Sequence, residues 1–84
     1  MRMKNKLLEK TFQVLEAVAA SPEPVSLKEL SGRLGINSST LSRIAADLVE
    51  TGYLTKAGYR NFEPALGLIR IGQNAVHSSH LPRT

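Results

Sequence analysis

The chain has 84 residues, 42% of them hydrophobic and 21% charged, which leaves room for one small globular domain and excludes a second. It has no cysteine, which excludes disulfides and thiolate metal sites, and no apolar run long enough to cross a membrane. Its net charge of +4 favours a polyanionic partner such as nucleic acid. We expect one soluble, cytoplasmic domain over residues 1–84, with an ordered core at about 5–78.

The first predicted element is an amphipathic helix at roughly residues 5–20. One side of this helix is mostly apolar and carries Leu7, Leu8, Thr11, Phe12, Val14, Leu15, Val18 and Ala19. Two prolines within residues 21–24 end the helix, because proline cannot donate to the helical hydrogen-bond ladder.

A short second helix is predicted to start at Ser26. Ser26 and Glu29 have the spacing of a capping box, in which the serine caps the helix and the glutamate bonds back to the cap amide. Val25 and Leu30 are placed as the accompanying hydrophobic staple. Gly35 follows about two turns later, where a left-handed residue ends a helix at least cost.

The third helix is predicted to begin at an Asn37 cap and to end at Gly52. Ile36 and Leu41 form its staple. Its apolar residues recur at helical spacing and are Leu41, Ile44, Ala45, Leu48 and Val49.

A hairpin and a last helix complete the predicted order. Residues 53–56 and 61–63 form two short strands around a turn that contains glycine. Pro64 suits the first turn of a helix that runs to about Ser78, before a polar tail.

The second and third helices match the helix-turn-helix pattern, in which the second helix of the pair lies in the major groove of DNA. Small hydroxyl residues let its N-terminus approach phosphates and base edges, and Arg43 can pair with a guanine edge through two hydrogen bonds. The candidate DNA-binding residues of this helix are Ser38, Ser39, Thr40, Ser42 and Arg43.

The hairpin has the place and charge of a wing. Its candidate DNA-binding residues are Lys56, Tyr59 and Arg60, which can reach the flanking backbone or minor groove. The predicted fold class is therefore mainly α, a winged helix-turn-helix with a three-helix core, a two-stranded β wing and a C-terminal linker helix.

The sequence resembles the N-terminal DNA-binding domain of the IclR family of bacterial transcriptional regulators. The resemblance covers residues 7–72 and is carried by LEKTFQVLEAVA, SLKELSGRLGINSSTLSRIAADLVETGYL and FEPALGLIRIG. It implies a dimer that binds a double-stranded DNA operator, normally followed by a separate effector-binding domain. The family usually has Tyr-x-Leu-Gly where this chain has residues 62–65, Phe-Glu-Pro-Ala.

The chain stops at Thr84, where a family member would continue into the effector domain. The sequence is therefore either a fragment or a stand-alone relative. A small-molecule effector is expected only if a C-terminal domain exists.

Two apolar stripes on the last helix suggest a homodimer. Leu66, Ile69 and Val76 form one stripe, and Leu68, Ile71 and Ala75 form the other. We expect one stripe to pack on the first helix and the other to meet a second subunit, which places two reading helices about one DNA turn apart.

Other interpretations of these residues remain open. Arg43 can instead pair with Asp47 one turn along its helix, the hydroxyl residues can serve only as caps, and Lys28 and Arg33 can be ordinary solubilising charges. A winged helix can also act as a protein-interaction module without DNA binding.

Catalytic and metal chemistry find no support in the sequence. It has no glycine-rich phosphate loop and no paired catalytic carboxylates, so we expect neither an enzyme nor a cofactor. His77 and His80 have the spacing of a metal pair but lack a third ligand, so we expect no metal.

Overall fold

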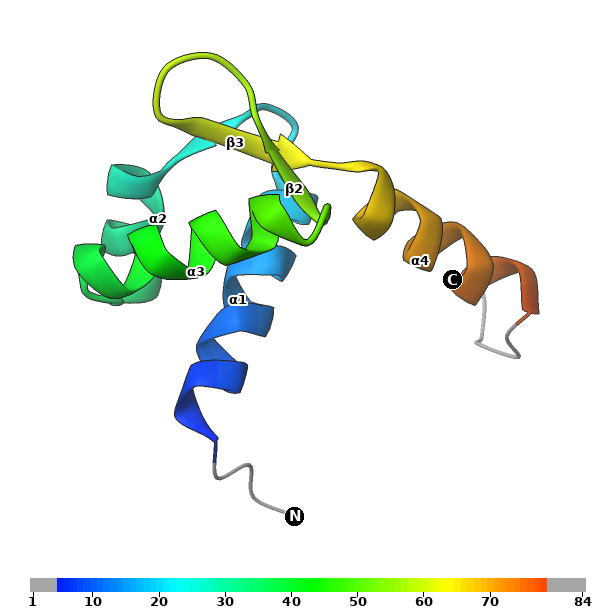
Figure 1. Ribbon diagram of the computed structural model, residues 1–84, viewed down its shortest axis with the longest axis horizontal. Coiled ribbons are helices and arrows are strands. Elements are labelled where there is room, and N and C mark those ends of the chain that lie inside the picture. Colours follow the sequence, from blue (N-terminus) through cyan, green and yellow to red (C-terminus); the bar gives the residue numbers. More distant parts are fainter. Residues whose placement is uncertain (1–4, 79–84) are drawn as a thin grey trace.

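A computed structural model describes residues 5–78 as four helices and a three-stranded antiparallel sheet (Figure 1). The elements are, in chain order, α1 (Lys6–Ala20), β1 (Val25–Ser26), α2 (Leu27–Leu34), α3 (Ser38–Glu50), β2 (Leu54–Lys56), β3 (Asn61–Pro64) and α4 (Leu66–Ser78). The predicted winged-helix fold is thus confirmed. The predicted polar tail, which includes His80, lies outside the described residues.

The ends of α2 follow the predicted capping residues, and α1 begins at an Asn5 cap that the sequence prediction did not name. The side-chain oxygens of Asn5 and Ser26 each accept an amide hydrogen bond in the first turn of α1 and α2, at 2.9 and 3.1 Å. Gly35 ends α2 in the left-handed region, with φ at 69°. The reciprocal half of the predicted capping box is not formed, since the Glu29 carboxylate instead accepts a charged hydrogen bond from Arg33 at 2.7 Å.

The core lies where α1, α2 and α3 meet the sheet. Its buried side chains are Val14, Val18, Val25, Leu30, Ile36, Leu41, Ile44, Ala45, Leu48, Leu54 and Phe62. Both predicted staple pairs belong to this set. Of the apolar side predicted for α1, however, Leu7, Leu8 and Phe12 are exposed. They lie in the N-terminal half of α1, where Leu8 and Phe12 line an open groove toward α4 and Leu7 lies beside α3.

The sheet contains one more strand than the predicted two-stranded wing. β3 is its central strand and pairs antiparallel with β2 on one side and with β1 on the other. Phe62 lies opposite Val25 in one pair and opposite Lys56 in the other. β1 therefore joins the start of α2 to the part of β3 that lies nearest the wing tip.

Pro64 ends β3, so the expectation that it lies in the first turn of the last helix is wrong. The Ala65 N–H donates to the Tyr53 carbonyl at 3.0 Å, which continues the pairing with β2 one residue past Pro64. Ladder hydrogen bonds in an antiparallel pair involve alternate residues, and the pair that contains Pro64 is one that makes none. The missing N–H of proline therefore costs this sheet nothing, and α4 begins only at Leu66.

The start of α4 is fixed to the base of the wing. The Gly67 N–H donates to the Gly52 carbonyl at 3.0 Å, and Leu68 packs against the core. Beyond this point α4 leads away from the helical body (Figure 1). In the part of the chain that the structure describes, no helix combines the length and apolar character that crossing a bilayer requires.

Candidate nucleic-acid interface

The outer face of α3 is the first part of the candidate interface. Four residues of α3 face the core and are buried, namely Leu41, Ile44, Ala45 and Leu48. Helical geometry then places Ser39, Arg43 and Ala46 on the opposite side, and all three are exposed. Ser42, also exposed, lies on the flank of α3 that faces the wing.

Asn37 organises the N-terminus of α3 as its predicted cap. Its side-chain oxygen accepts hydrogen bonds from the backbone amides of Ser39 at 2.8 Å and Thr40 at 3.4 Å. The same oxygen accepts from the Ser39 hydroxyl at 2.6 Å. Ser38 and Ser39 are exposed, whereas Thr40 is half-buried. The first turn of α3 therefore presents two hydroxyl groups to solvent, one of them already bonded to the cap.

Arg43 projects from the middle of α3 and lies near Ser39, Thr40 and Asp47, with which it lines a shallow hollow beside Leu7. It makes no ion pair with Asp47: within residues 5–78, the ion pair formed is the one that joins Glu29 to Arg33. The alternative of an intrahelical pair for Arg43 is thus not realised in the structure. Its guanidinium forms no ion pair within the described residues.

The tip of the wing places an aromatic ring and a cation side by side. Gly58 and Arg60 both have left-handed backbones, with φ at 85° and 63°. The guanidinium carbon of Arg60 lies 5.1 Å from the centre of the Tyr59 ring, within cation–π range. Tyr59 is 82% exposed. Arg60 is not a glycine, and a left-handed backbone costs such a residue about 1–2 kcal/mol.

A hollow between α3 and the wing gathers residues from three parts of the chain. It is lined by Leu27, Ser42, Ala46, Lys56, Gly58, Tyr59, Arg60 and Phe62. All three predicted wing residues thus meet Ser42 of α3, while Ser39, Thr40 and Arg43 line the hollow on the other flank. The sequence prediction missed the apolar part of this lining, because it depends on how β1 brings α2 to the wing.

Other candidate sites receive less support from the geometry. Lys28 is exposed and makes no ion pair within the described residues, whereas Arg33 is held by Glu29. Among residues 5–78, no three histidine, cysteine, aspartate or glutamate side chains gather as metal ligands would.

Comparison with known proteins gives one family and several solved structures. The chain matches the IclR helix-turn-helix domain over residues 7–58. The crystal structure of Thermotoga maritima IclR is similar with a TM-score of 0.73 and 21% identity, over 89% of this chain and 30% of that one. The crystal structure of Pseudomonas aeruginosa HmgR is similar with a TM-score of 0.79 and 23% identity, over 88% of this chain and 31% of that one.

An IclR family transcriptional regulator from Brucella abortus gives a TM-score of 0.80 and 21% identity, over 94% of this chain and 31% of that one. At these sequence identities, the structural similarity shows that this chain shares the fold of the regulators. The chain spans about a third of the length of these solved regulators. No curated protein sequence matches it significantly.

Proposed function

Because the chain belongs to the IclR family of DNA-binding transcription regulators, we propose that it binds a double-stranded DNA operator in a sequence-specific manner. In this proposal α3 lies in the major groove, and the wing contacts the flanking backbone or minor groove. Arg43 reads a base edge, and Lys56 and Arg60 hold phosphates. Ser38, Ser39, Thr40, Ser42 and Tyr59 complete the interface.

The observation that carries the proposal is the position of three cations, unpaired within residues 5–78, around the outer face of α3. Arg43, Lys56 and Arg60 are all exposed, and none forms an ion pair within the described residues. They flank the outer face of α3, where small side chains allow close approach of a groove wall. Lys28 is also exposed and unpaired in the part of the chain that the structure describes, so it is their place around the outer face of α3, rather than the lack of an ion pair, that sets the three cations apart.

Titration of the protein against DNA at several salt concentrations tests the proposal. Two phosphates neutralised by Lys56 and Arg60 give a slope of log K against log salt of about −1.8 for each protomer, and Arg43 adds to it where it meets a phosphate. The preferred sequence, obtained by selection from random duplexes, should bind more tightly than random DNA. Binding that shows neither salt dependence nor sequence preference would favour a protein-interaction module.

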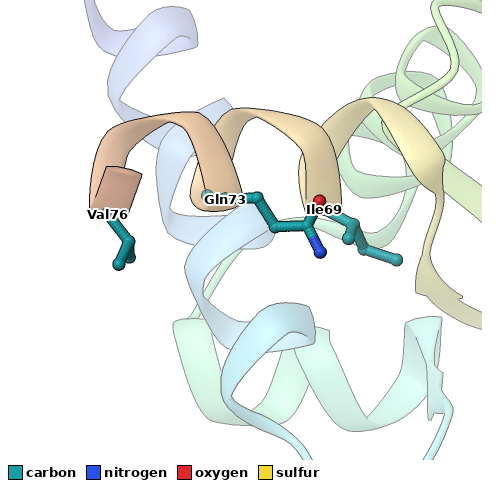
Figure 2. Close-up of a pocket in the computed structure, with 4 residues that line it drawn as sticks. Ile69, Gln73 and Val76 are labelled. Carbon is teal, nitrogen blue, oxygen red and sulfur yellow. The ribbon is translucent and has the colours of Figure 1, made fainter. Parts of the chain in front are cut away.

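We infer a homodimer through α4. Figure 2 shows Ile69, Gln73 and Val76 on the same side of α4, around an open apolar hollow. Leu66 and Val76 are 63% and 74% exposed, so this stripe has no partner within residues 5–78. Leu68 and Ile71 of the other stripe instead face α1 across an apolar groove. Sedimentation at high micromolar concentration should show a dimer, free and on DNA, and a strict monomer would contradict it.

The remaining expectations belong to the same proposal. A regulator of bacterial genes works in the cytoplasm, where the DNA is, and it performs no catalysis. Since the chain spans about a third of the solved regulators, a small-molecule effector is proposed only for a C-terminal domain that would follow Thr84. Addition of candidate effectors to residues 1–84 should therefore leave DNA affinity unchanged.

A further inference from the structure

Ser39 is an exposed hydroxyl on the outer face of α3, and its hydrogen bond to Asn37 restricts what it can recognise. The Asn37 side-chain atom that Ser39 approaches also accepts two backbone N–H groups. That atom must therefore be the oxygen, which has no proton to give. At 2.6 Å the Ser39 hydroxyl has to be the donor of this bond.

A hydroxyl has one proton and two lone pairs, so Ser39 is left with acceptor capacity alone. Phosphate oxygens offer only acceptors, and the Ser39 hydroxyl cannot donate to them while the Asn37 bond persists. In the major groove, adenine N6 and cytosine N4 are donors, whereas guanine and thymine present acceptors. We propose that Ser39 is a specificity-determining residue that selects a base with an exocyclic amine in the major groove, which is adenine or cytosine.

The position of Arg43 sets where this base lies. Arg43 follows Ser39 by one helical turn on the same exposed side, which is a rise of about 6 Å. Since successive bases of one strand lie about 3.4 Å apart, the amine base lies within about two base pairs of the position that Arg43 reads. Arg43 carries only donors and selects acceptors, so the two residues have opposite preferences.

Ser42 provides a natural contrast. Its hydroxyl forms no hydrogen bond within residues 5–78, and it is exposed beside the wing. It retains both donor and acceptor capacity and can bond a phosphate or either kind of base edge. Of these two exposed serines, Ser39 is thus the one whose hydroxyl proton is already used within the protein and which can only accept a further hydrogen bond.

The inference rests on the proposed DNA binding, and one experiment tests both. The wild-type protein first selects its preferred site from random duplexes. Affinities are then measured on that site with each adenine replaced by purine and each cytosine by pyrimidin-2-one, which lack the amine. Ser39→Ala and Ser42→Ala are measured on the same duplexes, and this corrects for the weaker base pairing of the analogues. Circular dichroism checks that each variant is folded.

We expect one position in each half-site where loss of the amine weakens wild-type binding by about 3- to 10-fold, the range of one net hydrogen bond. Removal of the amine at that position should weaken binding by Ser42→Ala by the same factor as for the wild type. For Ser39→Ala it should weaken binding only by the general effect of the base analogue. Asn37→Gly, a tolerated cap, frees the Ser39 hydroxyl to rotate and should relax the preference at that position.

Two results would overturn the inference. Equal losses in wild type and Ser39→Ala at every position, with a selected site in hand, would remove Ser39 from readout and leave the proposed DNA binding intact. If the wild type selects no sequence, or if its DNA affinity does not depend on salt concentration, the proposed function and this inference are both overturned.

Discussion

Gly67 packs directly against the base of the wing, and replacing it by alanine tests how α4 is held. A Cβ at this position would lie 2.6 Å from the Gly52 carbonyl oxygen and 2.6 Å from Cδ1 of Tyr53. Ordinary van der Waals contact begins at 3.4 Å, so α4 and the Gly52–Tyr53 segment must separate by about 0.8 Å. The Gly67 hydrogen bond to Gly52, now 3.0 Å long, is lengthened by that movement.

Crowding of this kind costs about 1–3 kcal/mol, and the weakened hydrogen bond adds up to about 1.5 kcal/mol. Alanine recovers at most about 1 kcal/mol through its better helix propensity. Gly67→Ala should therefore destabilise the domain by about 1–3 kcal/mol, which lowers the melting temperature by about 4–24 °C for a domain of this size.

Gly72 supplies the matched control, because it lies in the same helix and an added Cβ would meet nothing within 4 Å. Gly72→Ala should leave the melting temperature unchanged or raise it, by up to about 1 kcal/mol of added stability. Thermal unfolding followed by circular dichroism measures both variants. A Gly67→Ala protein that melts at or above the wild-type temperature would refute the packing of α4 described above.

Three further predictions concern the candidate interface. Arg43→Ala should reduce the binding free energy on the preferred site by about 1–3 kcal/mol and relax base selection at one position of each half-site, as measured by competition between specific and random duplexes. If the ratio of specific to random binding is unchanged in a folded variant, Arg43 contacts phosphate or does not contact DNA. Lys56→Ala should weaken binding about equally on all sequences and reduce the salt slope by about one unit, whereas Arg33→Ala, which removes the arginine already paired with Glu29, should change the slope much less. Arg60→Gly should relieve the left-handed backbone and raise stability by about 1 kcal/mol while weakening DNA binding, and a loss of stability would show that the Tyr59 contact outweighs the strain.

The parts of the fold that the sequence predicts best are those fixed by neighbours along the chain. A cap such as Ser26 or Asn37 acts on amides two or three residues away, so its effect can be inferred without knowing the tertiary structure. Gly35 is a similar case, since its left-handed φ ends α2 by itself. The spacing of apolar residues in α3 likewise predicts which face is buried, and therefore which face is available to DNA.

The features that the prediction missed depend on residues that are distant in sequence. β1 has only two residues, too few for an alternating pattern, and it becomes a strand because Val25 and Ser26 meet Phe62 and Asn61. Pro64 stays in β3 because of the register with β2, which no local rule about proline specifies. Leu7, Leu8 and Phe12 are exposed because they line open hollows beside α3 and α4 that the packing of the domain leaves unfilled.

Some residues of the candidate interface are placed by the local helical repeat and others by the tertiary fold, and the two groups have different proposed roles. Helical periodicity alone puts Ser39 and Arg43 on the outer face of α3, but the fold is needed to bring Lys56 and Arg60 beside Ser42 on one flank of the helix. A helix that enters a major groove turns its outer face to the bases and its flanks to the phosphate backbones. Base selection then belongs to Ser39 and Arg43, and phosphate attraction belongs to the wing. Because Ser39 and Arg43 lie on the outer face of α3 and the wing cations lie beside one of its flanks, a substitution in either group should alter base selection or phosphate attraction without altering the other.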